Sequence, residues 1–382
     1  MAYEFETSCL HGKIEEHDEA HYGALSYPIY QTATFSHKSL GESSGYDYSR
    51  LQNPTRQHLE EVMSVLESAY DTIAFSSGMA AISVIMELFA PGSHIIASED
   101  LYGGTTRFFE KINRKNGYDF TYVDTSDIEQ IEAALRENTA AVFVETPTNP
   151  MMYVTDLRKT AELTRKHGLL LIVDNTFLSP YFQKPLLLGA DIVVESGTKF
   201  LCGHNDTLAG FLSVKDQELS EKLRYLFKTT GAGLAPFDSW LLLRGIKTLP
   251  LRMERQQENA FLVVKWLQAQ KEIEQVAYIG LETHPSYSVH KGQSTGFGSM
   301  ISFRVDSEET AGRLLNGVKL IRFAESLGGV ESLITYPVTQ THADLPIEER
   351  LKRGIDYRLL RLSVGIENEK DLIEDLEQAL HA

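Results

Sequence analysis

The sequence predicts an α/β protein in which a mostly parallel central sheet is followed by a smaller α+β domain. Short apolar runs, typical of strands buried on both faces, alternate with helical periodicity from about residue 55 onward. After about residue 240, longer helices surround a segment in which apolar and polar residues alternate. We therefore expect an N-terminal arm over 1–49, a large domain over 50–240 and a small C-terminal domain over 241–382.

Each expected element rests on its own pattern of apolar residues and stop signals. In the large domain we expect helices at 56–69, 77–89, 128–136 and 157–167, and strands at 94–98, 120–123, 140–144, 169–173 and 192–194. In the small domain we expect helices at 258–270, 311–317 and 369–380, and strands at 299–305 and 361–364. Residues 1–49 have no sustained helical period, so we expect an arm that packs on another surface, such as a neighbouring subunit.

Composition excludes several classes of protein. The 382-residue chain is 42% hydrophobic and 23% charged, as globular proteins are. Its net charge of -17 disfavours nucleic acid or an anionic membrane as the main partner. The two cysteines, Cys9 and Cys202, form no disulfide framework, and neither a secretory signal nor a run long enough to span a bilayer is present. We expect a cytoplasmic protein.

Polar residues that follow strands are the candidate site residues, because ligands bind beyond the carboxyl ends of strands in a parallel α/β sheet. Gly78 and Met79 begin a helix behind Ser77, and the backbone N–H groups of such a start can bind an anion. Asn149 lies in a proline-bounded turn at 144–150, where its amide could bind a ring hydroxyl. Taken singly, an ordinary capped helix and a well-made turn are the better interpretations.

Two further strand ends carry ionisable groups. Asp174 ends an apolar strand, where a carboxylate needs a cationic or hydrogen-bonding partner such as a protonated pyridine nitrogen, or serves as a helix cap. Lys199 follows the strand at 192–194, and a buried lysine is readily nucleophilic, although a surface lysine is the alternative. Ser196 and Thr198, just before it, could bind a phosphate.

Together these signals make up the parts of a pyridoxal phosphate (PLP) site: an anion-binding helix start, a carboxylate for the pyridine nitrogen and a lysine for a Schiff base. No nucleotide-binding glycine fingerprint and no metalloprotease or Cys-x-x-Cys motif competes with this interpretation. The pairs His204 with Asp206 and Cys9 with His11 are two ligands each, too few for a metal site.

The chain resembles the Cys/Met-metabolism (trans-sulfuration) PLP-dependent enzymes over nearly its whole length. The matching segments include ETPTNP at 145–150 and SGTK at 196–199, with others at 48–50, 53–56, 76–80, 101–105, 173–176, 203–206, 326–329 and 361–365. The resemblance implies the aspartate-aminotransferase type of fold. It also implies a homotetramer, a dimer of dimers with shared active sites, acting on small amino-acid substrates.

The resemblance also implies roles for individual residues. Lys199 would hold the cofactor and shuttle protons, Asp174 would keep the pyridine nitrogen protonated, and Tyr102 would stack on the ring. The phosphate would be bound by Gly78, Met79, Ser196 and Thr198, and by Tyr48 and Arg50 of the neighbouring subunit. Asn149 would contact the ring hydroxyl and, with Ser326 and Arg361, the substrate, whose carboxylate Arg361 would bind.

Only a few residues indicate which reaction of the family the enzyme catalyses. Glu325 resembles the acid of γ-synthases and γ-lyases that can face the distal ammonium of cysteine or cystathionine, or it is a solvated charge. Gly104 stands where methionine γ-lyases usually have cysteine, and the stretches 203–210 and 334–342 look most like cystathionine γ-synthases. The working hypothesis is γ-replacement, in which an O-acylhomoserine and cysteine condense to cystathionine.

Other reactions and classes stay open. A cystathionine γ- or β-lyase, a methionine γ-lyase or a homocysteine desulfhydrase would use the same residues for elimination to a thiol, a keto acid and ammonia. Leu51 and Gln52 depart from the family pattern near the expected substrate entrance, so they leave the substrate open. A non-catalytic scaffold would have lost the lysine, the aspartate or the arginine, and a nicotinamide-dependent dehydrogenase would need a glycine fingerprint.

Overall fold

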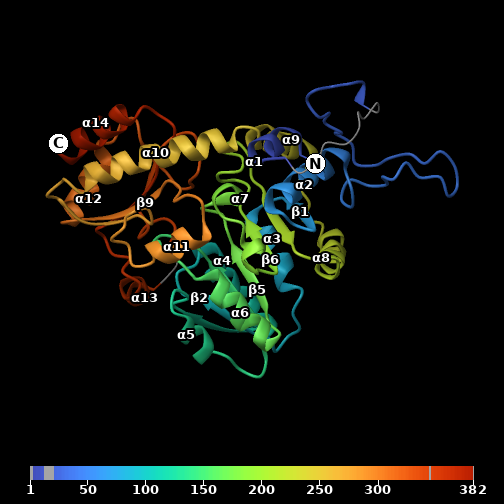
Figure 1. Ribbon diagram of the computed structural model, residues 1–382, viewed down its shortest axis with the longest axis horizontal. Helices are drawn as coiled ribbons and strands as arrows, with labels where there is room; N and C mark the ends of the chain where they lie inside the picture. The colour runs from blue at the N-terminus through green and yellow to red at the C-terminus, as the bar shows by residue number, and fades with distance from the viewer. Residues whose placement is uncertain (1–2, 13–20, 344–345, 382) are drawn as a thin grey trace.

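Two β-sheets, one in each half of the chain, organise the computed structural model, which describes residues 3–12, 21–343 and 346–381 (Figure 1). Among these residues the large sheet has seven strands in the order β1-β7-β6-β5-β4-β2-β3. They are β1 (Asp71–Phe75), β2 (His94–Ser98), β3 (Asp119–Val123), β4 (Thr139–Glu145), β5 (Leu170–Asp174), β6 (Ile192–Glu195) and β7 (Gly210–Val214). The small sheet, in the order β10-β11-β12-β9-β8, consists of β8 (Ile273–Ala277), β9 (Met300–Val305), β10 (Arg322–Phe323), β11 (Leu333–Thr335) and β12 (Leu359–Ser363).

The large sheet is mostly parallel, as the sequence predicts. Strands β3, β2, β4, β5 and β6 run parallel to one another, and only β7 is antiparallel to its neighbours β6 and β1. The sequence analysis missed β1 and β7. Each contains a buried polar residue, Thr72 and Ser213, whose hydroxyls hydrogen-bond to each other at 2.8 Å. This satisfied polar pair interrupts the apolar run that identifies a buried strand.

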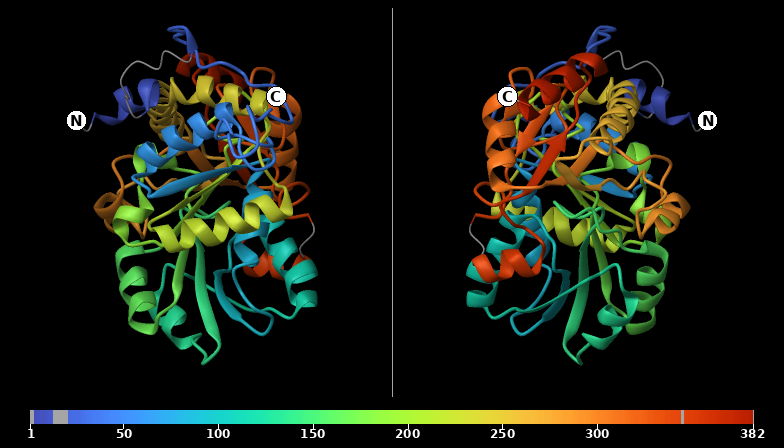
Figure 2. Two further views of the ribbon diagram at one scale, coloured as in Figure 1. Left: turned by 90° about the vertical axis from the view of Figure 1, so that its right-hand side faces the viewer. Right: turned by 90° about the vertical axis from the view of Figure 1, so that its left-hand side faces the viewer.

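Helices cover both faces of the large sheet (Figure 2). The helices before the small domain are α1 (Phe5–His11), α2 (Pro54–Glu67), α3 (Gly78–Met86), α4 (Gly103–Phe108), α5 (Ile128–Ala133), α6 (Leu157–His167), α7 (Ser179–Phe182), α8 (Gln217–Thr230) and α9 (Pro236–Ile246). Side-chain caps set two of the predicted starts, because Ser77 accepts a hydrogen bond from Ala80 N in α3 and Asp156 accepts one from Lys159 N in α6.

The small domain has a long helix that the sequence analysis placed too late. α10 (Leu249–Leu267) begins well before the predicted start near Glu258, because Pro250 fits the first turn of a helix and the buried polar residue Arg252 obscures the apolar period. The remaining helices are α11 (Tyr287–Gln293), α12 (Glu308–Gly317), α13 (Ile347–Lys352) and α14 (Glu369–Leu380). None of the helices in the described part of the chain is long and apolar enough to cross a membrane.

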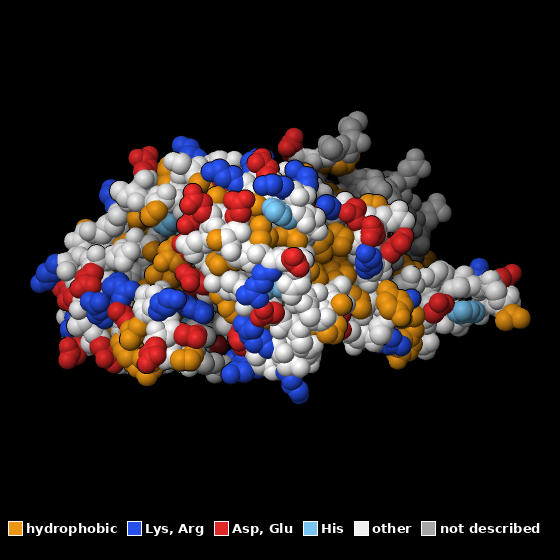
Figure 3. All heavy atoms as spheres, turned by 90° about the horizontal axis from the view of Figure 1, so that it is seen from below, with side chains coloured by type: hydrophobic (Ala, Val, Ile, Leu, Met, Phe, Trp, Pro, Cys, Tyr) orange, Lys and Arg blue, Asp and Glu red, His pale blue; other side chains and the backbone are white. Residues whose placement is uncertain are grey.

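The N-terminal arm differs from expectation in one respect. It contains the short helix α1, which packs against α2 although residues 1–49 lack a helical period. The rest of the described arm runs out from the body (Figures 1 and 3). Leu25 and Leu40 are 98% and 104% exposed there.

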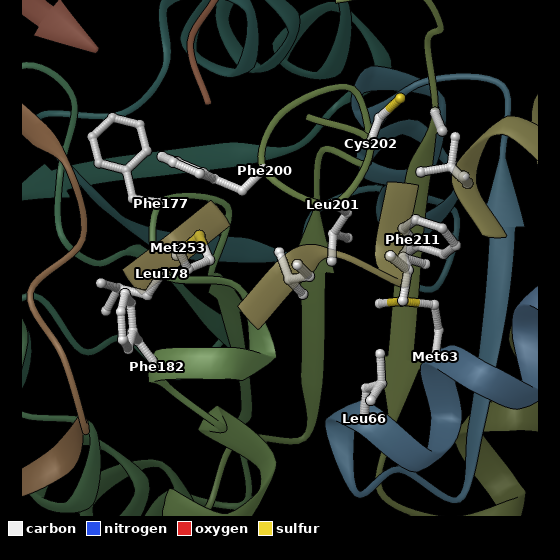
Figure 4. Close-up of a cluster of buried hydrophobic side chains, with 14 of the residues drawn as sticks. Met63, Leu66, Phe177, Leu178, Phe182, Phe200, Leu201, Cys202, Phe211 and Met253 are labelled. Carbon is white, nitrogen blue, oxygen red and sulfur yellow. The ribbon is translucent and has the colours of Figure 1, made fainter. Parts of the chain in front are cut away.

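One apolar cluster connects α2 to the segment that follows Lys199. Met63 and Leu66 of α2 lie in the same cluster as Leu201, Phe211 and Met253 (Figure 4). Leu201 is 2% exposed and Met253 is 1% exposed. The chain directly after Lys199 is therefore held by close packing from both halves of the molecule.

Candidate active site

The carboxyl ends of β4, β5 and β6 bring three acidic residues side by side. Glu145 pairs in register with Asp174, which in turn pairs with Val194, so that Glu195 follows at the next position. Glu145, Asp174 and Glu195 are 5%, 9% and 2% exposed. The turn after β6 then leads to Lys199, where Lys199 N donates a hydrogen bond to Ser196 O.

The Lys199 amine is a restrained, partly desolvated group. Nζ donates a hydrogen bond to Ser326 Oγ at 2.8 Å. Burial and, after it, the positive charge of Arg361 lower the pKa of the Lys199 amine to about 8, against the opposing charge of Glu325. A larger share of such an amine is unprotonated near neutral pH than of an ordinary lysine, so it is a better nucleophile and base.

Of the two carboxylate oxygens of Asp174, one accepts hydrogen bonds within the chain and the other does not. Oδ1 accepts hydrogen bonds from Thr176 N at 3.0 Å and from Thr176 Oγ1 at 2.6 Å. Burial raises the pKa of the Asp174 carboxyl to about 6, although the two Thr176 hydrogen bonds oppose this. Oδ2 has no hydrogen-bond partner among the described residues, so it is free to accept one from a protonated ring nitrogen.

The start of α3 supplies anion-binding groups. The N–H groups of Gly78 and Met79 are the first two of the helix and have no intrahelical acceptor. A side-chain carbon on Gly78 would lie 3.5 Å from Ser196 Oγ, so this hydroxyl lies beside the helix start. The Thr198 hydroxyl donates to Ala209 O at 3.3 Å and accepts from Ala209 N at 3.0 Å. These bonds brace the turn, and the expected contact of Thr198 with a phosphate stays a prediction.

Tyr102 lies over a glycine and is anchored by a buried carboxylate. Tyr102 N donates a hydrogen bond to Glu145 Oε2 at 2.8 Å, and the ring is 42% exposed. A side-chain carbon on Gly104 would lie 2.4 Å from Tyr102 Cε1, so the ring occupies its position only because residue 104 has no side chain. Burial raises the pKa of Glu145 well above its usual value, and the charge of Asp174 raises it further.

Arg361 lies at the centre of the substrate end of the site. It is 1% exposed, and its three hydrogen bonds end on neutral oxygens: Asn149 Oδ1 at 2.8 Å, Ser326 O at 2.9 Å and Thr335 Oγ1 at 3.0 Å. Burial lowers the pKa of Arg361 to about 10, which still leaves it charged at neutral pH. A buried guanidinium that bonds no carboxylate in the described chain suits an anionic ligand.

Ser326 and Glu325 flank this guanidinium. Ser326 has a φ of 87°, a left-handed conformation that is strained for serine, and it offers Oγ to Lys199 and its carbonyl to Arg361. Glu325 is exposed, and its charge acts on both Lys199 and Arg361. The structure therefore brings Glu325 to the mouth of the site.

Tyr48 and Arg50 do not join the other predicted residues within one chain. Arg50 Nη1 donates to Lys228 O at 2.6 Å, and its guanidinium lies 5.5 Å from the Tyr48 ring. Both side chains are exposed, Tyr48 on the arm and Arg50 at the first residue after it. Their expected role in a neighbouring subunit stays a prediction.

Sequence reasoning missed Glu145, Thr176 and Thr335. Glu145 could have been found, because it ends a buried apolar strand as Asp174 does. Thr176 and Thr335 carry no such signal, since each acts through a contact that only the folded chain defines.

The residues that converge here fit pyridoxal phosphate. The test is the set of unpaired polar groups: Asp174 Oδ2, the first N–H groups of α3, and Arg361 Nε, which is buried without a partner. They match a pyridine nitrogen, a phosphate and a carboxylate in chemistry. In the described ranges no group of three His, Cys, Asp or Glu side chains could hold a metal ion.

Comparisons with known proteins agree with this geometry. Residues 6–381 match the family model described as "Cys/Met metabolism PLP-dependent enzyme". The chain is 48% identical to a cystathionine gamma-lyase of Bacillus subtilis (strain 168), over 98% of each chain. It is 51% identical to a cystathionine gamma-synthase/O-acetylhomoserine (thiol)-lyase of the same organism, over 94% of this chain and 92% of the relative. A solved cystathionine gamma-lyase from Lactobacillus plantarum, complexed with L-serine, superposes with a TM-score of 0.96 at 43% identity, covering 99% of each chain.

Proposed function

Because the chain belongs to the Cys/Met-metabolism PLP-dependent enzymes, we propose that it is a cystathionine γ-synthase, condensing an O-acylhomoserine with cysteine by γ-replacement. The family, its cofactor and its trans-sulfuration chemistry are common ground for the synthase and its lyase relatives. Arg361 inside the site and the exposed Glu325 beside it fit both a synthase and a lyase, and the observation that supports the synthase is the 51% identity to a cystathionine gamma-synthase/O-acetylhomoserine (thiol)-lyase.

Arg361 and Glu325 carry charges opposite to those of the carboxylate and the ammonium group of the proposed substrates. Arg361 binds the α-carboxylate of the amino acid that enters, with Asn149 held against the guanidinium to orient it. Glu325 attracts the ammonium group of the second amino acid, whose thiol then points inward.

The catalytic groups divide the remaining work. Pyridoxal phosphate, when bound, supplies an electron-withdrawing ring that stabilises negative charge on the attached amino acid. Asp174 Oδ2 holds the proton of the ring nitrogen, and the N–H groups of Gly78 and Met79 with Ser196 Oγ bind the phosphate. Tyr102 would stack on one face of the ring.

Lys199 moves the protons. Its amine, with a pKa lowered to about 8 by burial, removes the α-proton and then acts at the neighbouring carbon, so that the γ-substituent leaves and the thiolate of cysteine takes its place. Ser326 Oγ holds Nζ between these steps. The bond broken is Cγ–O and the bond formed is Cγ–S, with a carboxylate as the leaving group.

Elimination by a cystathionine γ- or β-lyase is the second candidate. The 48% identity to a cystathionine gamma-lyase supports this candidate. The residues of the site fit both reactions, so they do not decide between them. One assay separates the two. The purified enzyme is incubated with an O-acylhomoserine plus cysteine, and separately with cystathionine alone, and cystathionine and keto acid are measured. Keto acid from cystathionine without any condensation product would overturn the synthase.

We also propose a cytoplasmic homotetramer in which each arm completes a neighbour's site. A groove of about 1580 Å³, lined by Leu25, Gln52, Asp71 and Trp240 among others, lies at the base of the arm. Its size and the exposed apolar arm suit packing between copies of the chain. Two buried free cysteines suit a reducing compartment.

A further inference from the structure

One face of α10 carries three buried polar side chains. Arg252, Gln256 and Asn259 are 3%, 0% and 0% exposed, and their spacing along the helix places them on the same side of it. α10 contacts α7 of the large domain as well as β8, β9 and α14 of the small domain (Figure 1). We call these three residues the polar face of α10, a helix that reaches both halves of the molecule.

Arg252 binds the segment that follows Lys199. Its Nη1 donates a hydrogen bond to Phe200 O at 2.6 Å, and its Nη2 donates to Leu201 O at 3.2 Å and to a carbonyl of α9 at 3.0 Å. A side-chain carbon on Gly203 would lie 2.1 Å from Nη1, so this approach requires that residue 203 has no side chain. Burial lowers the pKa of Arg252 to about 10, which leaves the guanidinium charged at neutral pH and strengthens these bonds.

Gln256 binds the segment that follows Ser326. Its Nε2 donates a hydrogen bond to Gly329 O at 2.7 Å. Ser326 Oγ accepts the hydrogen bond of Lys199 Nζ at 2.8 Å. α10 therefore holds both of the chain segments that meet in this hydrogen bond.

Asn259 binds the segment that follows Arg361. Its Nδ2 donates a hydrogen bond to Gly365 O at 3.0 Å and another to Glu367 O at 2.8 Å, both beyond the end of β12. Arg361 itself donates to Ser326 O at 2.9 Å. The polar face of α10 thus reaches each of the three segments that carry the amine, the hydroxyl and the guanidinium of the site.

Stability alone does not account for the two amides. Gln256 Oε1 and Asn259 Oδ1 are buried without a hydrogen-bond partner in the described chain. Buried acceptors of this kind lower stability, and apolar side chains at the same positions would not carry them. What offsets this cost is the fixed position of the carbonyl groups to which the amides donate.

We propose that the polar face of α10 consists of positioning residues, which set the distances among Lys199, Ser326 and Arg361. Lys199 belongs to the large domain and the other two to the small domain, so neither sheet by itself fixes these distances. The inference goes beyond the proposed reaction, because a synthase and a lyase need the same spacing. It rests on the proposed function only in taking Arg361 as the group that binds the substrate carboxylate.

The experiment compares two variants that should affect different ends of the site. Arg252→Lys keeps the charge but loses the planar fork, so the full-length apoprotein should capture pyridoxal phosphate about tenfold more slowly above the pKa of Lys199. Its holoprotein should bind glycine as the wild type does. Asn259→Leu releases the segment after Arg361, so its holoprotein should bind glycine about tenfold more weakly, with the capture of pyridoxal phosphate unchanged.

Glycine is the probe because it has an α-carboxylate and no side chain, and its dissociation constant is read from the absorbance of bound pyridoxal phosphate. The matched control is Gln257→Leu, at the neighbouring position of α10. Gln257 Oε1 accepts a hydrogen bond from Phe297 N at 2.5 Å, outside the three segments, so this variant should change neither measurement. Arg252→Gln and Asn259→Ser make the same comparison should either first variant not fold.

The crossed result, with slow capture in one variant and weak glycine binding in the other, would support the proposal. Equal losses of both variants in both measurements would overturn it. Lower thermal midpoints with unchanged capture and unchanged glycine binding would overturn it too, since α10 would then contribute only to stability. A wild-type holoprotein that bound no glycine would contradict the role proposed for Arg361, and the capture measurement would then decide the positioning role through Lys199.

Discussion

Arg361 of β12 donates a hydrogen bond from Nη1 to Asn149 Oδ1, 2.8 Å away, and so joins the small sheet to the turn after β4 of the large sheet. The contact spans 212 positions of sequence. Arg361 Nε is buried without a hydrogen-bond partner, so it can donate to a ligand. The substrate end of the site is therefore assembled from both domains at once.

Replacing Arg361 with lysine should lower kcat/KM sharply. Lysine keeps the charge but loses the planar fork that contacts Asn149 and a carboxylate together. Losing one charge-assisted hydrogen bond costs about 2 kcal/mol, which corresponds to roughly a 30-fold lower kcat/KM. Steady-state kinetics check this, with the exposed Arg322→Lys as control. Equal losses in both variants would contradict a substrate role for Arg361.

Gly104→Cys should displace the Tyr102 ring. The new Cβ would lie 2.4 Å from Tyr102 Cε1, so the ring has to move away from the position in which it can stack on the cofactor. An aromatic stack is worth about 1 kcal/mol, so pyridoxal phosphate should bind about fivefold more weakly. Absorbance titration of the apoprotein measures this. Gly312→Ala is the control, because a side chain there meets nothing within 4 Å. Unchanged binding by Gly104→Cys would show that Tyr102 does not stack.

The helices that the sequence predicted best are those with local signals at both ends. α6 and α14 have the predicted bounds because Asp156 and Asn368 cap their starts and an amphipathic period runs through each. The edge strand β1 and its neighbour β7 were missed because the Thr72–Ser213 pair is stabilised across strands, which no local pattern reveals. The start of α10 was missed because its buried polar residues bond to loops far along the chain.

The site residues also fall into those that local sequence patterns predict and those that they do not. Asp174 and Lys199 were predictable because the end of a buried strand is a position that sequence can mark. The bond of Thr198 to Ala209 was not predictable, since it depends on how β7 returns beside β6.

The capture of pyridoxal phosphate by the apoprotein should depend on pH in a defined way. The Lys199 amine attacks an aldehyde only when it is unprotonated, and burial lowers its pKa to about 8. The rate should therefore rise with pH up to about 8 and then level off. Stopped-flow absorbance measures the rate, and Lys199→Ala should not acquire the yellow colour. A rate that keeps rising towards about pH 10, the ordinary lysine value, would mean that Lys199 is not desolvated.

Mixing two inactive variants tests whether active sites are shared between subunits. Arg50 is exposed at the first residue after the arm and contacts Lys228, not Lys199, in its own chain. If each arm completes a neighbour's site, Arg50→Ala and Lys199→Ala should each be inactive. An equimolar co-refolded mixture should regain about a quarter of wild-type activity, all of it from mixed dimers. In those dimers one site receives a native arm and a native lysine.

The matched control is a mixture of Lys199→Ala with Asp174→Ala. Both residues serve the same subunit's site, because the strands that carry them are neighbours in one sheet. Each site of a mixed dimer then lacks one essential residue, so activity should not return. If the Arg50 mixture also failed to recover, the arm would act within its own chain, and the fully exposed Leu25 and Leu40 would need a different partner surface.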